Sequence, residues 1–167
     1  AHALFDYLAA LGHREIAYVS GPAEFQHTRI RADVLTALAQ RDVTGETLVT
    51  DFSPAAATAV TRTLLSRAAR PTAIVYDNDV MAIAGLRVAQ EMGVAVPAAL
   101  SVASFDDSVV TGLVHPSITC LTRDTFALGE QAAVFLLERI DSRDPLPARR
   151  GPIPSLTIRE STAAPSR

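Results

Sequence analysis

Residues 72–82 read Thr-Ala-Ile-Val-Tyr-Asp-Asn-Asp-Val-Met-Ala, an apolar run followed by three polar residues and the start of a helical pattern. A short continuous apolar run that is rich in β-branched and aromatic residues is typical of a strand buried on both faces. The polar residues that follow suit a helix N-cap, and Gly93 stops the helix that begins there. The stretch therefore predicts a strand, a polar turn and a helix in direct succession.

The same succession of strand, polar turn and helix is predicted before and after this stretch of the chain. The sequence predicts strands over residues 16–20, 48–52, 72–76, 100–105, 118–122 and 155–159. It predicts helices over residues 4–11, 28–40, 54–69, 79–92 and 126–140, with Ser53 as an N-cap, a loop from Asp107 to Pro116 and another over 141–154. Alternating strands and helices with continuous apolar strands indicate an α/β fold, a doubly wound and mostly parallel sheet with helices on both faces.

Composition excludes several classes of protein. The 167 residues are 49% hydrophobic and 20% charged, with a net charge of −3, no lysine and no run of arginines. This pattern argues against a membrane span, a disordered chain and a nucleic-acid-binding face. The single Cys120 permits no internal disulfide, which fits a cytoplasmic location. The four histidines lack the spacing of a metal site, and we expect neither a metal nor a cofactor.

Polar side chains follow the four main strands, at the point where each strand ends. These ends are Ser20-Gly21-Pro22, Asp51-Phe52-Ser53, Asp77-Asn78-Asp79 and Asp106-Asp107. Ligands of open α/β sheets bind beyond the carboxyl ends of the strands. Carboxylates, an amide and one aromatic ring suit a polyhydroxylated ligand, because they accept and donate hydrogen bonds and cover the C–H face of a ring.

Each of these residues also has a purely structural interpretation. Asp51 and Asp79 sit where helix caps occur, and Phe52 fits an ordinary core position. No helical pattern begins directly after Asp106, which favours a ligand contact there, and Asp107 should point to the opposite side of the chain. Asp77 and Asp79 would lie about 7 Å apart in an extended strand, a spacing known from inverting glycosidases. The chain turns into a helix at this point, so we expect no enzyme.

Three further segments, together with residues 71–82, carry a resemblance to a known family. Residues 12–22 read Gly-His-Arg-Glu-Ile-Ala-Tyr-Val-Ser-Gly-Pro, and residues 93–107 include Ser-Val-Ala-Ser-Phe-Asp-Asp. The chain ends its last strand with Arg-Glu-Ser-Thr at residues 159–162. In their residues and in their order along the chain, these segments resemble the lactose-repressor (LacI/GalR) family of bacterial transcription regulators.

The resemblance implies a periplasmic-binding-protein-like lobe. Residues 1–162 would form the C-terminal lobe of an effector-binding domain, and about 120–141 would belong to the N-terminal lobe. Residues 163–167 are expected to be a disordered tail. The helix-turn-helix and most of the N-terminal lobe would lie outside this chain, so we expect weak effector binding and no DNA binding by these residues alone.

The resemblance also implies which residues contact the effector. Asp106 matches the family's effector-binding aspartate, Asn78 the asparagine of its Asn-Asp pair, and Phe52 the aromatic residue that stacks on the effector. Arg123 matches a position near the lobe crossover that faces the cleft. The family's effector-binding arginine matches Arg31, with Arg29 as the alternative, because the surrounding segment is one residue short and lacks a glycine.

The function implied is that of an effector-sensing and dimerisation core of a transcriptional regulator. The effector would be a carbohydrate or another small metabolite, the homodimer would form partly through the helix at 79–92, and operator DNA would bind only through the missing N-terminal domain. A periplasmic sugar-binding protein of an ABC transporter shares the fold and is the alternative; a Rossmann-type enzyme rests on fold alone.

Overall fold

The computed structural model describes residues 1–142 and 147–166. In chain order the elements are α1 (His2–Leu11), β1 (Glu15–Ser20), α2 (Gln26–Ala37), the 3-10 helix η1 (Leu38–Arg41), β2 (Thr44–Val49), α3 (Pro54–Leu65), β3 (Ala73–Tyr76), α4 (Asp79–Glu91), β4 (Ser101–Ser104), α5 (Val109–Leu113), β5 (Thr119–Thr122), α6 (Thr125–Asp141) and β6 (Ser155–Thr157).

The strands form a sheet in the order β2-β1-β3-β4-β5-β6. All neighbouring pairs are parallel except β5 and β6, which are antiparallel. The predicted doubly wound, mostly parallel fold is therefore confirmed. After β1 the chain adds β2 next to one edge of that strand and then β3 next to its other edge. The connections that follow β1 and β3 therefore run in opposite directions across the sheet. The position between β1 and β3 is thus the topological switch point, where such sheets bind ligands.

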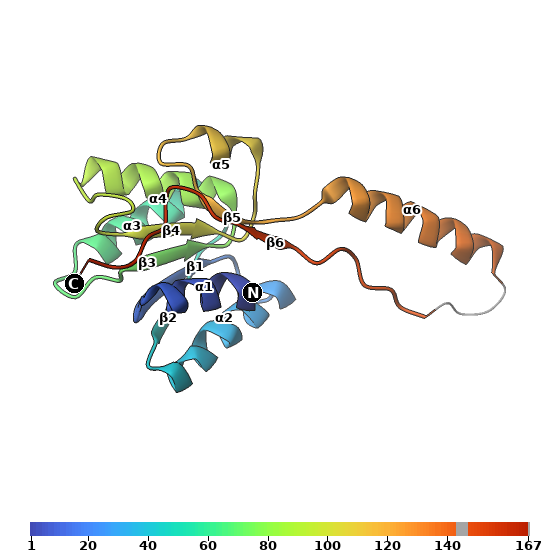
Figure 1. The fold of residues 1–167 in the computed structure, drawn as a ribbon, viewed down its shortest axis with the longest axis horizontal. Coiled ribbons are helices and arrows are strands. Elements are labelled where there is room, and N and C mark those ends of the chain that lie inside the picture. Colours follow the sequence, from blue (N-terminus) through green and yellow to red (C-terminus); the bar gives the residue numbers. More distant parts are fainter. Residues whose placement is uncertain (143–146, 167) are drawn as a thin grey trace.

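Hydrophobic cores cover both faces of the sheet (Figure 1). On one face, α1 and α2 contribute Phe5 and Leu35 to a core that contains Tyr18 of β1. On the other face, α3 and α4 contribute Leu64 and Met81. Successive strand residues point to opposite faces, so burial on both sides explains why β1, β3 and β4 read as continuous apolar runs.

Two local predictions have clear outcomes. Ser53 is the N-cap of α3, with its hydroxyl accepting from Ala56 N at 3.1 Å and Pro54 in the first turn, as the sequence predicted. The loop predicted from Asp107 to Pro116 is wrong in part, because α5 lies within it. This helix is too short to show a periodic pattern, and its buried Thr111 is anchored by tertiary contacts.

Helix α6 projects away from the sheet together with the irregular segment that leads back to β6 (Figure 1). It contains no buried residue, although Phe126, Leu136 and Ile140 are apolar and at least 59% exposed. No helix in the described part of the chain combines the length and apolar character needed to cross a bilayer. Apart from the contacts of Leu128 and Phe135 with the returning segment 149–151, the apolar surface of α6 has no partner inside residues 1–142 and 147–166.

The segment after β6 returns to the sheet and packs along it. The Ser161 hydroxyl donates to Val102 O at 2.6 Å, and Ala163 N donates to Ser101 Oγ at 3.1 Å. The imidazole of His13, which is 1% exposed, contacts Ala163 O through Nε2 at 2.9 Å. The side chains of Ser101 and His13 thus bind Ala163, and Ser166 Oγ donates to Ala98 O at 2.9 Å, so residues 163–166 of the expected disordered tail are held against the rest of the chain. Arg167 and part of the expected 141–154 loop lie outside the described residues.

Gly85 marks the closest approach between α4 and β3. A Cβ atom at this position would lie 2.0 Å from Tyr76 Oη, which hydrogen-bonds Thr61 Oγ1 at 2.7 Å in the core. Tyr76 is fully buried and cannot swing aside.

We expect Gly85→Ala to lower the free energy of unfolding by about 1–3 kcal/mol, despite the better helix propensity of alanine, because it overpacks the core. Gly112→Ala is the control, since apart from its chain neighbours and its own helix backbone no atom lies within 4 Å of the added Cβ. Urea unfolding followed by circular dichroism measures both. Equal stability of the two variants would contradict the close packing.

Asp107 ties the C-terminal segment to the sheet. Its carboxylate accepts two hydrogen bonds of 2.9 Å from the guanidinium of Arg159, and others from Thr111 and Thr122 at 2.6 Å. Burial by itself would raise the pKa of Asp107, but these hydrogen bonds outweigh it and lower the pKa to about 2.

We expect Asp107→Asn to cost about 2 kcal/mol of unfolding free energy at neutral pH. A carboxyl whose pKa is depressed by folding stabilises the protein above its unfolded pKa. The difference between wild type and variant should therefore shrink as the pH falls from about 4 toward 2. Chemical unfolding at several pH values tests this, with Asp6→Asn as a control that removes an exposed ion pair to Arg41. A pH-independent difference would show that the charge of Asp107 does not matter.

Candidate functional site

The carboxylate of Asp77 lies at the switch point, directly after β3, and is the centre of a buried polar cluster. Tyr18 Oη donates to Oδ1 at 2.7 Å, and Gly21 N donates to Oδ2 at 2.8 Å. Thr28 Oγ1 donates to Oδ2 at 3.2 Å, and Arg31 forms an ion pair with Oδ1. Asp77 is only 1% exposed. These contacts connect β1, the loop after it, α2 and the end of β3.

Arg31 reaches this cluster from α2. Its Nη1 also donates to the Asp77 carbonyl at 3.2 Å, and its Cζ lies 4.2 Å from the ring centroid of Phe105, a cation–π arrangement. Within the described part of the chain, Nε and Nη2 of Arg31 have no hydrogen-bond acceptor. The predicted effector arginine is thus largely buried and ion-paired through one nitrogen, whereas the alternative Arg29 is exposed.

Asp106 lies next to Phe105 and has a different environment from Asp107. Its backbone N donates to Ser104 Oγ at 3.1 Å, but no described residue donates a hydrogen bond to its partly buried carboxylate. Burial raises the pKa of Asp106, the positive charges of Arg31 and Arg123 oppose this, and Asp79 and Asp77 add to it. The adjacent carboxylates therefore differ: that of Asp107 accepts hydrogen bonds from Arg159, Thr111 and Thr122, and that of Asp106 accepts none from the described residues.

Phe52 lies beside the same strand ends in an unusual backbone conformation. Its φ is 67°, a region that costs a non-glycine residue about 1–3 kcal/mol. Phe52 N donates to Thr50 Oγ1 at 3.3 Å, which helps to hold this conformation. A Cβ atom on Gly21 would lie 1.9 Å from the Phe52 ring, so only glycine lets the ring lie against the loop after β1.

Asn78 performs the capping role that the sequence left open. Its Oδ1 accepts from Met81 N at 2.9 Å as the N-cap of α4, and its Nδ2 donates to Phe52 O at 3.5 Å. The side-chain amide of Asn78 therefore contacts Phe52, and these two predicted site residues lie next to each other. Asp51 is not the cap of α3, because Ser53 holds that position; its carboxylate accepts from Ser53 N at 2.9 Å in the turn before the helix.

Two aromatic residues that the sequence analysis did not single out extend this surface. The ring of Phe25 lies 5.7 Å from that of Phe52, and the ring of His27 lies 6.2 Å from it and is nearly parallel. Phe25 is 45% exposed. Both residues come from the irregular segment after β1 and the start of α2, where no periodic pattern points to them.

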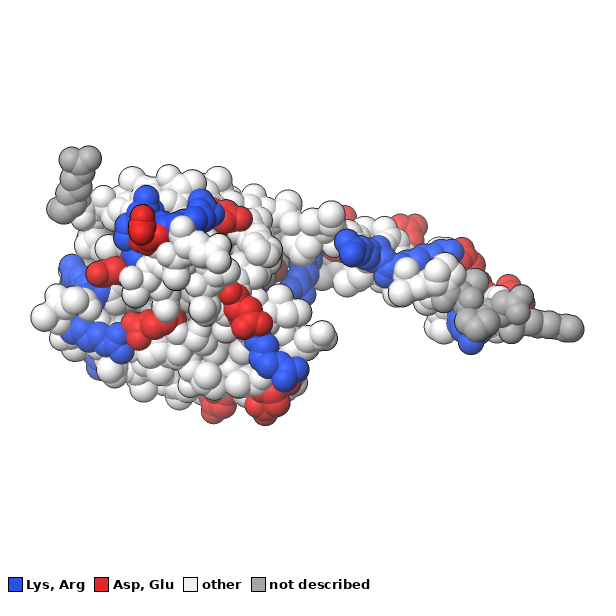
Figure 2. Space-filling view, turned by 90° about the horizontal axis from the view of Figure 1, so that it is seen from below, with Lys and Arg blue, Asp and Glu red and all other residues white. Residues whose placement is uncertain are grey.

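Arg123 follows β5 and is exposed, close enough to Asp106 to affect its pKa. Acidic and arginine side chains are interspersed over the face shown in Figure 2, without a broad area of one sign. Among the described residues, no group of three or more His, Cys, Asp or Glu side chains is arranged to hold a metal ion. The predicted residues thus lie at one edge of the sheet, with Asn78 touching Phe52, and Arg31 and Arg123 acting on Asp106.

Such a site can bind, but its described groups are not arranged for acid–base chemistry. Asp77 and Asp79 do not form a pair around a reacting atom, because Asp77 is fully engaged inside the protein and Asp79 accepts from Val80 N at 2.8 Å. What remains available is one carboxylate, the outer donors of one arginine and an aromatic wall. These groups suit recognition of a hydroxyl-rich ring.

Comparisons with known proteins agree with this geometry. Residues 5–162 match the periplasmic binding protein-like domain. The chain is 33% identical over 161 residues to the HTH-type transcriptional regulator CelR of Thermobifida fusca, covering 92% of this chain and 46% of that protein. The chain therefore spans about half the length of the curated relatives it matches.

Solved structures give the same assignment. A LacI family transcriptional regulator from Bifidobacterium animalis subsp. lactis superimposes with a TM-score of 0.94 at 39% identity, covering 98% of this chain and 60% of that one. The dimeric Lac repressor with an 11-residue C-terminal deletion has a TM-score of 0.87 at 28% identity, covering 97% and 60%. These relatives are named as transcription regulators and not as transport proteins. The chain belongs to the periplasmic binding protein-like domain family, in the form found in LacI-type regulators.

Proposed function

We propose that this chain is the effector-sensing part of a DNA-binding transcriptional regulator that acts in the cytoplasm. The observation that carries the proposal is the Asp106 carboxylate, which is partly buried at the carboxyl edge of the sheet and receives no hydrogen bond from the described residues. A desolvated acceptor without a donor is costly, and a ligand that supplies hydroxyl donors removes that cost.

The effector we propose is a carbohydrate or a similar hydroxyl-rich metabolite. Asp106 would accept hydrogen bonds from neighbouring hydroxyls, Arg31 would donate through Nε or Nη2, and the Phe52 ring would cover an apolar face. Asn78 would contribute its amide beside Phe52, and Arg123 would contact the effector from the end of β5. The support for this assignment is the clustering of these chemical groups at the switch point.

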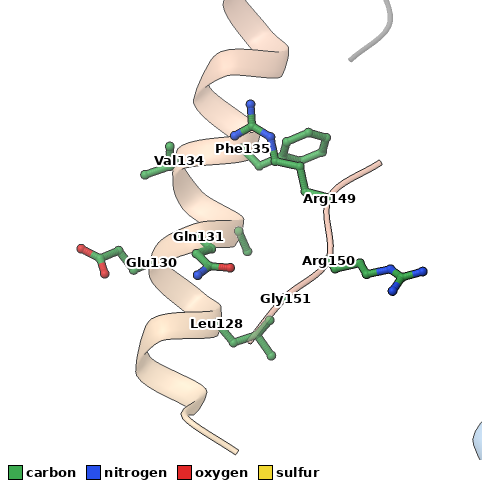
Figure 3. A pocket seen from close by; sticks show the side chains of 9 residues that line it. Leu128, Glu130, Gln131, Val134, Phe135, Arg149, Arg150 and Gly151 are labelled. Carbon is green, nitrogen blue, oxygen red and sulfur yellow. The ribbon is translucent and has the colours of Figure 1, made fainter. Parts of the chain in front are cut away.

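Helix α6 is proposed to belong to the second lobe of the effector-binding domain. Its apolar side chains and the returning segment 149–151 enclose a hollow of about 500 Å³, lined by Leu128 and Phe135 among others (Figure 3). Arg149 lies 5.3 Å over the Phe135 ring and bonds Glu138 at 2.5 Å. A projecting helix of this composition needs a further apolar partner. The other lobe would supply it, and the DNA-binding part would likewise lie outside these residues.

A homodimer through α4 and α3 is the second part of the proposal. The two helices border a groove lined by Val80, Ile83 and Ala84 of α4 and by Pro54 and Thr58 of α3. Arg62, Arg87 and Glu91 also line the groove, and an apolar strip flanked by charges of both signs suits pairing with its own copy about a two-fold axis. The related Lac repressor structure is described as dimeric.

For effector binding, we expect one compound from a panel of sugars, sugar phosphates and nucleosides to raise the melting temperature of the protein encoded by the whole gene. Asp106→Ala should weaken its binding about 10- to 100-fold, because it removes a charged hydrogen-bond acceptor. Thermal shift followed by calorimetry measures both effects.

The control is Asp33→Ala, which removes an exposed carboxylate on α2 away from the strand ends. Because burial raises the pKa of Asp106, binding should begin to weaken with falling pH above the pH at which an ordinary aspartate titrates. No stabilising compound, or equal binding by wild type and Asp106→Ala, would contradict the proposed function.

For the dimer, we expect Val80→Arg to shift the protein encoded by the whole gene from dimer to monomer in light scattering coupled to size exclusion. The added charges from the two copies would meet across the axis, near Arg62 and Arg87, which also line the groove. Val110→Arg is the matched control, because Val110 is 50% exposed, close to the 44% of Val80, but lies on α5. Dissociation by both variants or by neither would contradict the assigned interface.

A further inference from the structure

We propose that Asp77 is a positioning residue that orients and neutralises Arg31, so that the site selects uncharged, hydroxyl-rich effectors over phosphorylated or carboxylated ones. This inference rests on the proposed function and narrows the class of effector. It concerns a residue that touches Arg31 and not the effector itself.

The position of the Asp77 carboxylate does not depend on Arg31. Tyr18 Oη and Gly21 N hold one oxygen each, at 2.7 and 2.8 Å, and Thr28 adds a third donor. The carboxylate is therefore a fixed acceptor that determines where Arg31 Nη1 lies.

The guanidinium plane of Arg31 is restrained from a second direction. Its Cζ lies 4.2 Å from the centroid of the Phe105 ring, while Nη1 also donates to the Asp77 carbonyl at 3.2 Å. A planar guanidinium held at one nitrogen and over one ring face has little rotational freedom. The remaining donors, Nε and Nη2, are thus presented at a set angle beside Asp106.

The balance of charge around Asp106 disfavours an anion. The charged groups that act on Asp106 are Arg31, Arg123, Asp77 and Asp79. With Asp106 itself, three carboxylates face two arginines. The positive charge of Arg31 is already matched by a buried carboxylate, and Arg123 is exposed to solvent.

Recognition of a phosphate group generally uses an arginine whose two-nitrogen fork is available and uncompensated. Here Asp77 occupies Nη1 and thus the end-on fork, and its buried carboxylate compensates the positive charge of the side-on pair Nε and Nη2, which stays free within the described part of the chain. A neutral polyol needs only single donors and acceptors, which Arg31 and Asp106 still provide. Removing the charge of Asp77 should therefore convert the site toward anion binding.

The test compares Asp77→Asn with Asp79→Asn, using inorganic phosphate as the probe. Each variant removes one carboxylate near Asp106, but Asp79 has no contact with Arg31 among the described residues. Phosphate binding is followed by phosphorus NMR and calorimetry. The ionic strength is kept constant by replacing chloride with the added phosphate. We expect Asp77→Asn to bind phosphate about tenfold more tightly than wild type, and Asp79→Asn to stay within about twofold of wild type.

Equal phosphate binding by the two variants would show that only overall charge matters and would overturn the positioning role. Wild-type binding as tight as that of Asp77→Asn would overturn it as well. Circular dichroism and melting temperature establish whether each variant is folded. If Asp77→Asn does not fold, the wild-type protein carries the test.

The wild-type measurement is nitrogen NMR of arginine guanidinium groups, with the Arg31 signal assigned by its loss in Arg31→Lys. We expect separate, slowly exchanging Nη1 hydrogens for Arg31 that do not respond to millimolar phosphate. The exposed Arg123 provides the freely rotating reference. Averaged signals for Arg31, or a phosphate-dependent shift, would overturn the proposal.

Neither measurement uses an effector. A failed effector screen combined with the expected phosphate result would contradict the proposed function and support the role of Asp77. A successful screen combined with equal phosphate binding by the variants would do the reverse.

Discussion

The buried ion pair between Asp77 and Arg31 is the interaction on which the rest of the site depends. The Asp77 carboxylate is 1% exposed and has hydrogen-bond donors in place of water, which come from β1, the loop after it and α2. Taking charges out of water costs several kcal/mol each, so the backbone segments that supply the donors are held in place together. The cluster sits at the switch point, where the fold itself opens the sheet to a ligand.

The neighbouring carboxylates Asp106 and Asp107 show how the fold assigns different roles to identical side chains. The two side chains follow β4 in a bend and lie in different surroundings. One side holds Arg159, Thr111 and Thr122, which lower the pKa of Asp107 to about 2 despite its burial. The other side holds no donor among the described residues, so burial raises the pKa of Asp106. Asp107 stabilises the C-terminal segment, and the Asp106 carboxylate accepts no hydrogen bond from the described residues.

The sheet with its covering helices and the projecting helix α6 differ in how much of their apolar surface they bury. The sheet buries its own apolar residues on both faces, with α1 and α2 on one side and α3 and α4 on the other. Helix α6 buries none of its residues, yet it is continuous with β5, which lies inside the sheet. In the proposed regulator, the movement of a second lobe packed on α6 would reach the effector site through β5 and Arg123, one of the two residues between that strand and α6.

The sequence by itself determined the alternation of strands and helices, the burial of the sheet on both faces and the cap at Ser53, because these features follow from local periodicity and turn chemistry. It also indicated which strand ends carry polar groups. Only the tertiary structure decided that Asp77 pairs with Arg31, that Phe52 adopts a positive φ against Gly21, and that residues 163–166 pack on the sheet. Those partners are distant in sequence, and the approach of separate elements, which no local pattern encodes, brings them together.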